Sequence, residues 1–250
     1  MPTIPEPARL LRPDPMPQST AVPPTQSRLD ADATEVLACL DGGGVAIIPL
    51  DVAYAIIGQR ENAIRRIFAA KQRSYEKPSG LLATWMMSEA IHDLPSDRRD
   101  MIRTVIEQED LPFSVVAPFD ARHPFFARVD PFVMRNSTRA GTLDMLLNAG
   151  ALHTTLARKS WEAMKPVFGS SANTSLRGSK YALQDIEPEV LGAADLMVDH
   201  GRSRYANPDG CSSTIIDFRD FRVIRPGVRI DDLRRVFRER FDVVLIEEAQ

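Results

Sequence analysis

The sequence predicts an α/β protein in which helices flank a twisted mixed sheet. Short apolar runs that are typical of buried strands alternate with longer segments whose apolar residues recur at helical spacing. This interleaving continues along most of the chain without an internal repeat, which favours one sheet with helices packed against it. We therefore expect one domain over residues 29–240, between a Pro-rich disordered tail at 1–28 and a C-terminal tail at 241–250.

The N-terminal tail is predicted from its prolines. Residues 1–28 hold 8 of the 19 prolines of the chain, and proline removes a backbone donor and interrupts helices. The apolar residues there show no sustained period, so the segment lacks a face to bury. Order is expected to begin near Asp30, because Asp30 or Asp32 can cap a helix that ends at the glycines of 42–44.

Apolar residues at helical spacing predict the other helices. One opens at Asn62 and ends in the basic stretch Lys71-Gln72-Arg73, and the helical residues 88–110 are interrupted at Pro95. Further helical patterns cover 152–164, part of 190–198 and about 231–239.

Continuous apolar runs bounded by turn residues predict the strands. These runs are 45–49, 54–57, 81–85, 113–118, 143–147, 167–173, 213–218 and 222–225. The run at 167–173 leads into the polar turn Ser170-Ser171-Ala172-Asn173. Residues 119–141, which are rich in Pro, Arg and Phe, are expected to form an irregular excursion.

Composition limits the class of protein. The 250 residues are 44% hydrophobic and 26% charged with a net charge of −3, which is ordinary for a globular protein and unsuited to coating nucleic acid. No run reaches the roughly 20 apolar residues of a membrane helix, and no secretory leader is recognisable. The cysteines, Cys39 and Cys211, lie far apart, and the histidines lack ligand spacing. We expect a cytoplasmic protein with reduced thiols and no metal site of its own.

A cluster of cations follows the helix that opens at Asn62. Lys71, Arg73 and Lys77 lie within seven positions. A lysine supplies a compact charge and an arginine a planar fork, and both suit phosphate oxygens. The alternative is a solvated helix end whose cations complement the helix dipole, and on spacing alone that alternative is favoured.

Two further polar clusters follow strands. Ser171 and Asn173 could hold a ligand at the carboxyl end of a strand, or they could simply form a turn. Ser213 enters one strand and Arg225 leaves the next, which places a hydroxyl and a phosphate-binding cation at strand ends. The alternative there is two ordinary strand ends.

In chain order these pieces resemble the YrdC-like family of threonylcarbamoyl-AMP synthases, which includes YciO-like paralogues. The resemblance covers about residues 30–235. Five motifs carry it, and they are the opening at Gly43–Ile56, the Lys71/Arg73 pair with Lys77-Pro78, the strand at 111–118, the Ser171/Asn173 pair, and Ser212–Asp217 followed by Arg225-Pro226-Gly227.

This resemblance implies a single YrdC-like domain with a concave basic pocket. The implied activity is that of a nucleotidyltransferase, which joins L-threonine, bicarbonate and ATP into threonylcarbamoyl-AMP and releases pyrophosphate. The product serves tRNA threonylcarbamoyladenosine modification. The implied partners are these small molecules and tRNA-modification proteins, and magnesium is the implied cofactor. The resemblance also implies RNA binding, and it implies no association with a membrane.

The resemblance also assigns roles to residues. Lys71, Arg73, Ser171 and Asn173 are implied to be catalytic. Nucleotide binding is implied for Lys71, Arg73, Lys77, Asn173 and Arg225. Substrate binding is implied for Asp51, Tyr54, Ser171 and Ser213.

The chain departs from the family pattern in its first motif. Leu50 and Val52 stand where the family has threonines, so hydroxyls that would bind substrate are replaced by apolar groups. An arginine of the family is also missing from its slot near Asn148-Ala149, and Arg135 is a possible replacement. Two alternatives therefore stay open. One is a diverged paralogue that carbamoylates another amine, and the other is a non-catalytic nucleotide- or RNA-binding protein.

Overall fold

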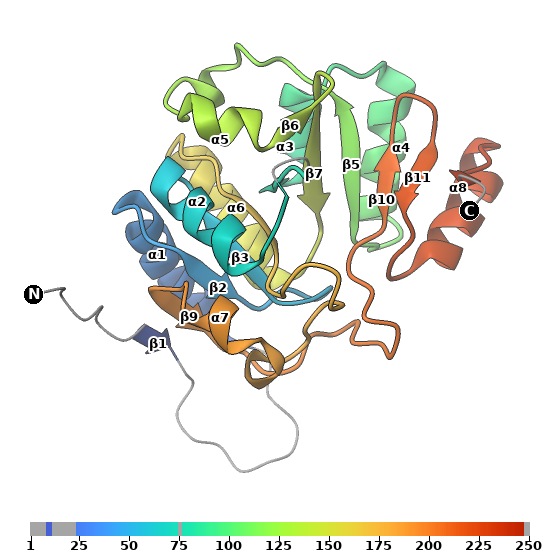
Figure 1. Cartoon of the computed structure of the whole chain (residues 1–250). Coiled ribbons are helices and arrows are strands. Elements are labelled where there is room, and N and C mark those ends of the chain that lie inside the picture. The colour runs from blue at the N-terminus through green and yellow to red at the C-terminus, as the bar shows by residue number, and fades with distance from the viewer. Residues whose placement is uncertain (1–8, 12–23, 75–76, 248–250) are drawn as a thin grey trace, which may run out of the picture.

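The structure, a computed structural model, describes residues 9–11, 24–74 and 77–247. Within these residues eight α-helices surround one large mixed sheet (Figure 1). The helices are α1 (Gln26–Asp41), α2 (Glu61–Ala70), α3 (Trp85–Ile91), α4 (Ser96–Glu107), α5 (Pro131–Arg135), α6 (Ala151–Glu162), α7 (Pro188–Leu191) and α8 (Ile230–Phe241). The predicted α/β class with a twisted mixed sheet is confirmed.

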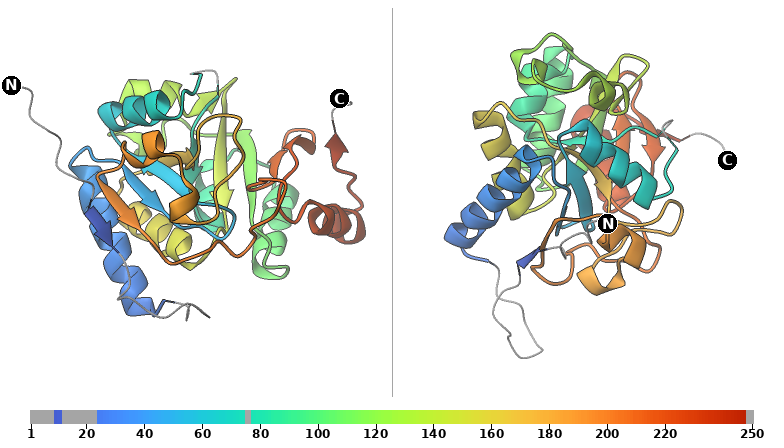
Figure 2. Two further views of the ribbon diagram at one scale, coloured as in Figure 1. Left: turned by 60° about the horizontal axis from the view of Figure 1, so that its bottom comes forward. Right: turned by 60° about the vertical axis from the view of Figure 1, so that its left-hand side comes forward.

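Twelve strands of the described chain form the sheet. They are β1 (Arg9–Leu11), β2 (Ala46–Ile48), β3 (Ala55–Gly58), β4 (Gly80–Leu82), β5 (Phe113–Pro118), β6 (Thr138–Arg139), β7 (Thr142–Leu147), β8 (Phe168–Ser171), β9 (Leu196–Val198), β10 (Ile215–Asp217), β11 (Arg222–Arg225) and β12 (Ile246–Glu247). Their order is β1-β9-β2-β3-β8-β4-β7-β5-β10-β11-β12, and β6 pairs with β7. Parallel and antiparallel pairs are mixed along the sheet. Helices α1 and α8 lie at its opposite ends (Figure 2).

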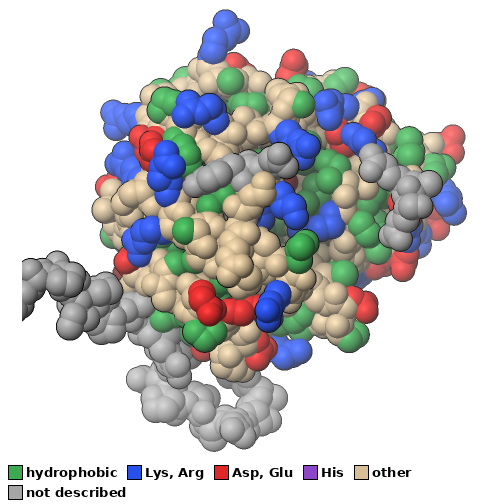
Figure 3. All heavy atoms as spheres, viewed as in Figure 1, with side chains coloured by type: hydrophobic (Ala, Val, Ile, Leu, Met, Phe, Trp, Pro, Cys, Tyr) green, Lys and Arg blue, Asp and Glu red, His purple; other side chains and the backbone are tan. Residues whose placement is uncertain are grey.

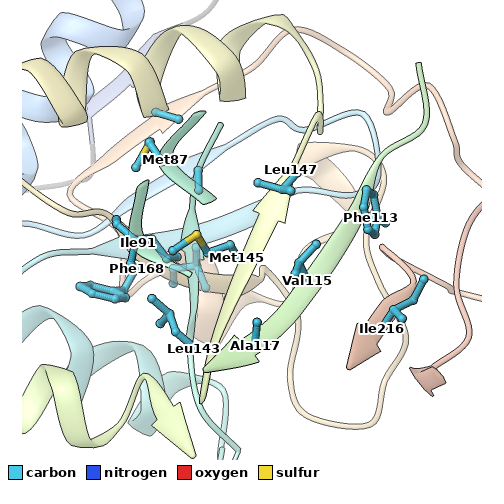
Figure 4. Close-up of a cluster of buried hydrophobic side chains, with 14 of the residues drawn as sticks. Met87, Ile91, Phe113, Val115, Ala117, Leu143, Met145, Leu147, Phe168 and Ile216 are labelled. Atoms are coloured by element: carbon cyan, nitrogen blue, oxygen red, sulfur yellow. The ribbon is translucent and has the colours of Figure 1, made fainter. Parts of the chain in front are cut away.

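Strand alternation separates two hydrophobic clusters on the two faces of the sheet. In β7, Leu143, Met145 and Leu147 enter the larger cluster, which also receives residues of α2, α3, α4 and α8. Figure 4 shows these three side chains beside Met87 and Ile91 of α3. The smaller cluster lies against α1 and α6. Because side chains alternate along a strand, every second residue of β7 faces away from the larger cluster.

The element boundaries differ from the prediction at the N-terminal end of the domain. Helix α1 begins at Gln26, inside the predicted tail, because the Thr25 hydroxyl accepts a hydrogen bond from the Arg28 amide at 3.3 Å. Asp32 is instead buried and pairs with His200 at 2.8 Å. Residues 9–11 form β1 on the edge of β9, while residues 1–8 and 12–23 of the predicted tail lie outside the described residues.

Other element boundaries also differ from the prediction, and one of them is set by a helix cap. The predicted strand 81–85 stops at Leu82, and Thr84 caps α3 by accepting from the Met87 amide. The predicted irregular segment 119–141 contains a 3₁₀ turn (Pro124–Phe126), α5 and β6. At the C-terminal end, β12 extends the sheet into the predicted tail of 241–250.

Candidate functional site

Lys71 ends helix α2, and its side chain turns into the protein. Its Nζ donates hydrogen bonds to the backbone carbonyls of Ser171 and, at 2.6 Å, of Asn173. The backbone closes the same contact, since the amide of Ser175 donates to the Lys71 carbonyl at 2.9 Å. The structure therefore brings Lys71, Ser171 and Asn173 together, and Lys71 fastens the turn after β8 to the end of α2.

Burial dominates the electrostatics of Lys71. The side chain is 1% exposed. Burial lowers the pKa of Lys71 to about 7, the charge of Arg73 acts in the same direction, and Glu187 opposes both. An ammonium that is enclosed and already bound to two carbonyls has little capacity left for a ligand. Lys71 consequently holds the turn after β8 in place and does not offer a free charge to a ligand.

The turn after β8 holds polar groups that the fold leaves unused. Asn173 donates from Nδ2 to the Thr174 carbonyl at 2.7 Å, while its Oδ1 is buried and has no partner among the described residues. The hydroxyl of Ser175 and that of Ser170, which lies in the last part of β8, are also buried without a partner in the described chain. Buried polar atoms are normally paired, so this turn has the capacity to bind a donor from outside the described chain.

Arg73 binds the backbone of the segment that follows α2. Its Nε donates to the carbonyl of Lys77 at 3.0 Å, and its Nη2 donates to that of Pro78 at 2.8 Å. A guanidinium has five N–H donors, so these two bonds leave others available. Arg73 is half-buried, and Lys77 is exposed to solvent. On the face viewed in Figure 3, several Lys and Arg side chains gather near the middle.

Arg225, the last residue of β11, contacts Ser213, which precedes β10. The Nη2 of Arg225 donates to the Ser213 carbonyl at 2.8 Å and lies 3.3 Å from its hydroxyl oxygen. That hydroxyl is 3.5 Å from the hydroxyl of Ser114 in β5. Ser114 and Arg225 both lie directly beside Ile215 in the strand register, which places them on one face of the sheet.

Asp144 of β7 experiences the charges of both arginines. It faces away from the larger hydrophobic cluster, opposite Val116 of β5. Burial raises the pKa of Asp144 to about 6, although Arg225, a hydrogen bond with Ser114 and Arg73 each lower it. Its Oδ1 is buried without a hydrogen-bond partner in the described chain. Arg73, Asp144 and Arg225 therefore form one electrostatic group across the loop after α2, β7 and β11.

Tyr54 and Asp51, two of the residues predicted to bind substrate, differ in how far they are buried. Tyr54 is fully buried, and its hydroxyl lies 2.7 Å from the Asp199 carboxylate and 2.8 Å from the Gly201 carbonyl. Asp51 is half-buried, and burial raises its pKa against the opposing charge of Arg204. The amide of Asp51 donates to the Ala149 carbonyl at 2.8 Å, which fixes the loop before β3.

Leu50 and Val52, which replace the family's threonines, belong to the smaller hydrophobic cluster. They are 5% and 1% exposed. Their cluster includes Ala55, Ala149 and residues of α1 and α6. The core therefore includes the two residues that flank Asp51, one of the predicted substrate-binding residues.

Arg135 does not fill the slot of the missing family arginine. It is exposed at the end of α5, before β6 and β7. The slot at Asn148-Ala149 follows β7, whose first residues pair with β6. A six-residue strand spans roughly 20 Å, so Arg135 and the slot lie at opposite ends of β7.

Sequence reasoning missed Asp144 and Ser114 as members of the site. Both lie on strands that were predicted, at alternate positions to the buried Leu143, Met145, Phe113 and Val115. A polar side chain on the second face of a buried strand was the available signal. What the sequence did not reveal is that this second face is the one that Arg73 and Arg225 approach.

Neither a metal centre nor a membrane span is found in the described part of the chain. No group of three or more His, Cys, Asp or Glu side chains there could hold a metal ion. Both cysteines are free. Of the helices that the structure describes, none combines the length and the apolar composition that crossing a membrane requires.

Comparison with known proteins identifies a family and a fold. The Sua5/YciO/YrdC family model, whose description reads "Telomere recombination", matches residues 38–227. No curated protein matches the chain in sequence. The fold resembles a hypothetical protein, smu.1377c, from Streptococcus mutans UA159, with a TM-score of 0.71 and 18% identity over 94% of this chain and 96% of that one.

Two further solved structures share the fold. P. abyssi Sua5, crystallised with L-threonine, has a TM-score of 0.67 and 18% identity over 96% of this chain. The match covers 62% of that Sua5 chain, so the present chain spans less than two thirds of its length. E. coli YciO has a TM-score of 0.59 and 17% identity over 88% of this chain and 95% of that one.

Proposed function

Because this chain belongs to the Sua5/YciO/YrdC family, we propose that it is an ATP-dependent nucleotidyltransferase that forms a carbamoyl adenylate. L-threonine is the first candidate for the amine, and the product would then serve tRNA threonylcarbamoyladenosine modification. The reaction joins the amine nitrogen to the carbon of bicarbonate with loss of water. An oxygen of the resulting carbamate attacks the α-phosphorus of ATP, and the bond to pyrophosphate breaks.

The observation that carries this proposal is the convergence of Arg73 and Arg225 on one polar face of the sheet. Both act electrostatically on Asp144, and both retain N–H donors beyond the bonds that hold them. Fixed guanidinium groups stabilise the charge of a transferring phosphoryl group without reorganisation. We assign the phosphates of ATP to a concave basic pocket at this face, with Lys77 at its exposed edge.

The turn after β8 is proposed to orient the reacting end of the substrates. Lys71 holds this turn by its backbone carbonyls, and Ser171 and Asn173 present their side chains from it. In this assignment Lys71 is a positioning residue, whereas Arg73, Ser171 and Asn173 contact ligand. Magnesium would enter with the phosphates of ATP, where it supplies further neutralisation of their charge.

One observation favours a second candidate for the amine substrate. Leu50 and Val52 lie inside a hydrophobic cluster, so they offer no hydroxyl to the threonine side chain. A site without those donors is better suited to an amine whose side chain is apolar. The second candidate function is therefore carbamoyl adenylate formation on another amine, by the same charged residues.

The proposal is tested by incubating the full chain with ATP, labelled bicarbonate and single amino acids. We expect pyrophosphate release that requires all three components, with label appearing in an adenylate. Omission of the amine controls for simple ATP hydrolysis, which leaves all of the label in bicarbonate and none in an adenylate. ATP binding without pyrophosphate release for any amine would contradict the proposal and would indicate a non-catalytic nucleotide-binding protein.

A further inference from the structure

Asp144 is an acid in a region that the proposed function assigns to anions. The charges of two cations, Arg73 in the loop after α2 and Arg225 in β11, both favour its ionised form. None of the ion pairs within 4 Å that the described residues form includes Asp144, so both arginines act across a gap. The carboxylate is therefore the internal counter-ion of two arginines that it does not touch.

The carboxyl group of Asp144 packs closely against strand β4. In β4 the neighbouring residue is Gly80, where an added Cβ would lie 3.2 Å from Asp144 Oδ2. Ser114 provides one hydrogen bond, while Oδ1 is buried and unpartnered within the described chain. A buried carboxylate oxygen without a donor is costly to keep ionised. A proton on Oδ1 would turn it into a donor for an incoming ligand oxygen.

We propose that Asp144 is a specificity-determining residue that couples anion binding to proton uptake. In the free protein its carboxylate balances Arg73 and Arg225. When an anionic phosphate group takes that place, one proton from solvent moves onto Oδ1, and the resulting carboxylic acid donates a hydrogen bond to a phosphate oxygen. This inference rests on the proposed nucleotide site, and it adds a residue that the family motifs do not contain.

Few charged groups surround Asp144, so the pH dependence of anion binding can be assigned to it. Arg73 faces it from the loop after α2 and Arg225 from β11, while β5 contributes Ser114 and β4 contributes only Gly80. Cys211 acts on Arg225 and not directly on Asp144. Both arginines stay charged over the physiological range. A change in anion affinity between pH 5.5 and 8.5 is therefore expected to follow Asp144.

The experiment compares ATP binding to the wild-type chain and to Asp144→Asn by calorimetry from pH 5.5 to 8.5. An asparagine cannot ionise, and it has nearly the same shape. Because burial raises the pKa of Asp144 to about 6, the wild type loses affinity about tenfold per pH unit above that value relative to the variant. At pH 8 we expect Asp144→Asn to bind about a hundredfold more tightly. Titration of ATP itself is common to both proteins and cancels in the ratio.

Two controls separate this role from general effects of charge or folding. Asp100→Asn removes the same charge from the exposed surface of α4, and it is expected to bind ATP as the wild type does. Calorimetry of both proteins in buffers of different ionisation enthalpy should show that the wild type takes up close to one more proton per ATP than Asp144→Asn at pH 8.

The outcomes distinguish this inference from the proposed function. Equal or weaker ATP binding by Asp144→Asn at pH 8, or parallel pH profiles, overturns the role of Asp144. Weaker binding in that variant would indicate a carboxylate that holds a metal or an amine instead. If inorganic pyrophosphate shows the Asp144 dependence while ATP does not bind, the inference stands and the nucleotide proposal fails. If neither anion binds at any pH, both are overturned.

Discussion

The two ends of the candidate site differ in polarity and in the donors that they expose. At one end Arg73 and Arg225 approach a polar sheet face and retain unused donors. At the other end Leu50 and Val52 are packed among apolar side chains, and their exposed fractions are only 5% and 1%. A charge recognises phosphate oxygens over some distance, whereas a hydroxyl recognises an amino acid only by direct contact. This difference favours retained nucleotide binding with an altered amine.

Removing the charges tests the polar end and should have the largest effect. We expect the double substitution Arg73→Gln, Arg225→Gln to weaken ATP binding by at least about a hundredfold, because hydrogen bonds to charged groups contribute about 1.5–3 kcal/mol each. Calorimetry measures the loss. Arg122→Gln is the matched control, since that side chain is 98% exposed. ATP binding that survives the double substitution would place the phosphates elsewhere.

A substitution at Lys71 tests whether this residue stabilises the fold or binds ATP, because its ammonium is already bonded to two backbone carbonyls. In Lys71→Met the carbonyls of Ser171 and Asn173 lose their donor, and each unsatisfied buried group costs about 1–3 kcal/mol. We expect the free energy of unfolding to fall by about 2–6 kcal/mol in urea denaturation. The exposed Lys77→Met serves as control and should be near neutral. If unfolding is unchanged while ATP binding is lost, Lys71 acts on the ligand directly.

The apolar end is tested by restoring the family's hydroxyls. In Leu50→Thr, Val52→Thr, we expect faster threonine-dependent pyrophosphate release than in the wild type, by roughly ten- to a hundredfold if both hydroxyls bind substrate. Stability should decrease by about 1–3 kcal/mol, because a hydroxyl replaces buried methyl groups. The control Leu50→Val, Val52→Ala shrinks the same side chains without adding a hydroxyl. Equal rates in wild type and double variant would show that other residues recognise threonine.

Much of the fold could be predicted because its signals are local. The apolar runs at 45–49 and 113–118 and the helical spacing after Asn62 depend on neighbours in the chain, and each became the expected kind of element. Boundaries failed where a single cap decides them. Thr25 and Thr84 each start a helix with one side-chain hydrogen bond, and several residues in each region could have done so.

The site was less predictable because its decisive contacts join distant segments. The sequence identified Lys71, but not that its ammonium binds carbonyls a hundred residues away in the chain. Asp144 was missed because its strand also presents Leu143 and Met145, and alternation alone does not tell which face is covered. Leu50 and Val52 were recognised as departures, whereas their place in the smaller hydrophobic cluster required the tertiary structure.

The most direct test of the difference between the two ends is calorimetry on the wild-type chain with each ligand separately. ATP is titrated first, and L-threonine with bicarbonate is then titrated into the protein saturated with a non-hydrolysable ATP analogue. The account predicts saturable ATP binding at one site and at least about tenfold weaker binding of threonine. Threonine binding as tight as that of ATP, or no ATP binding at all, would contradict it.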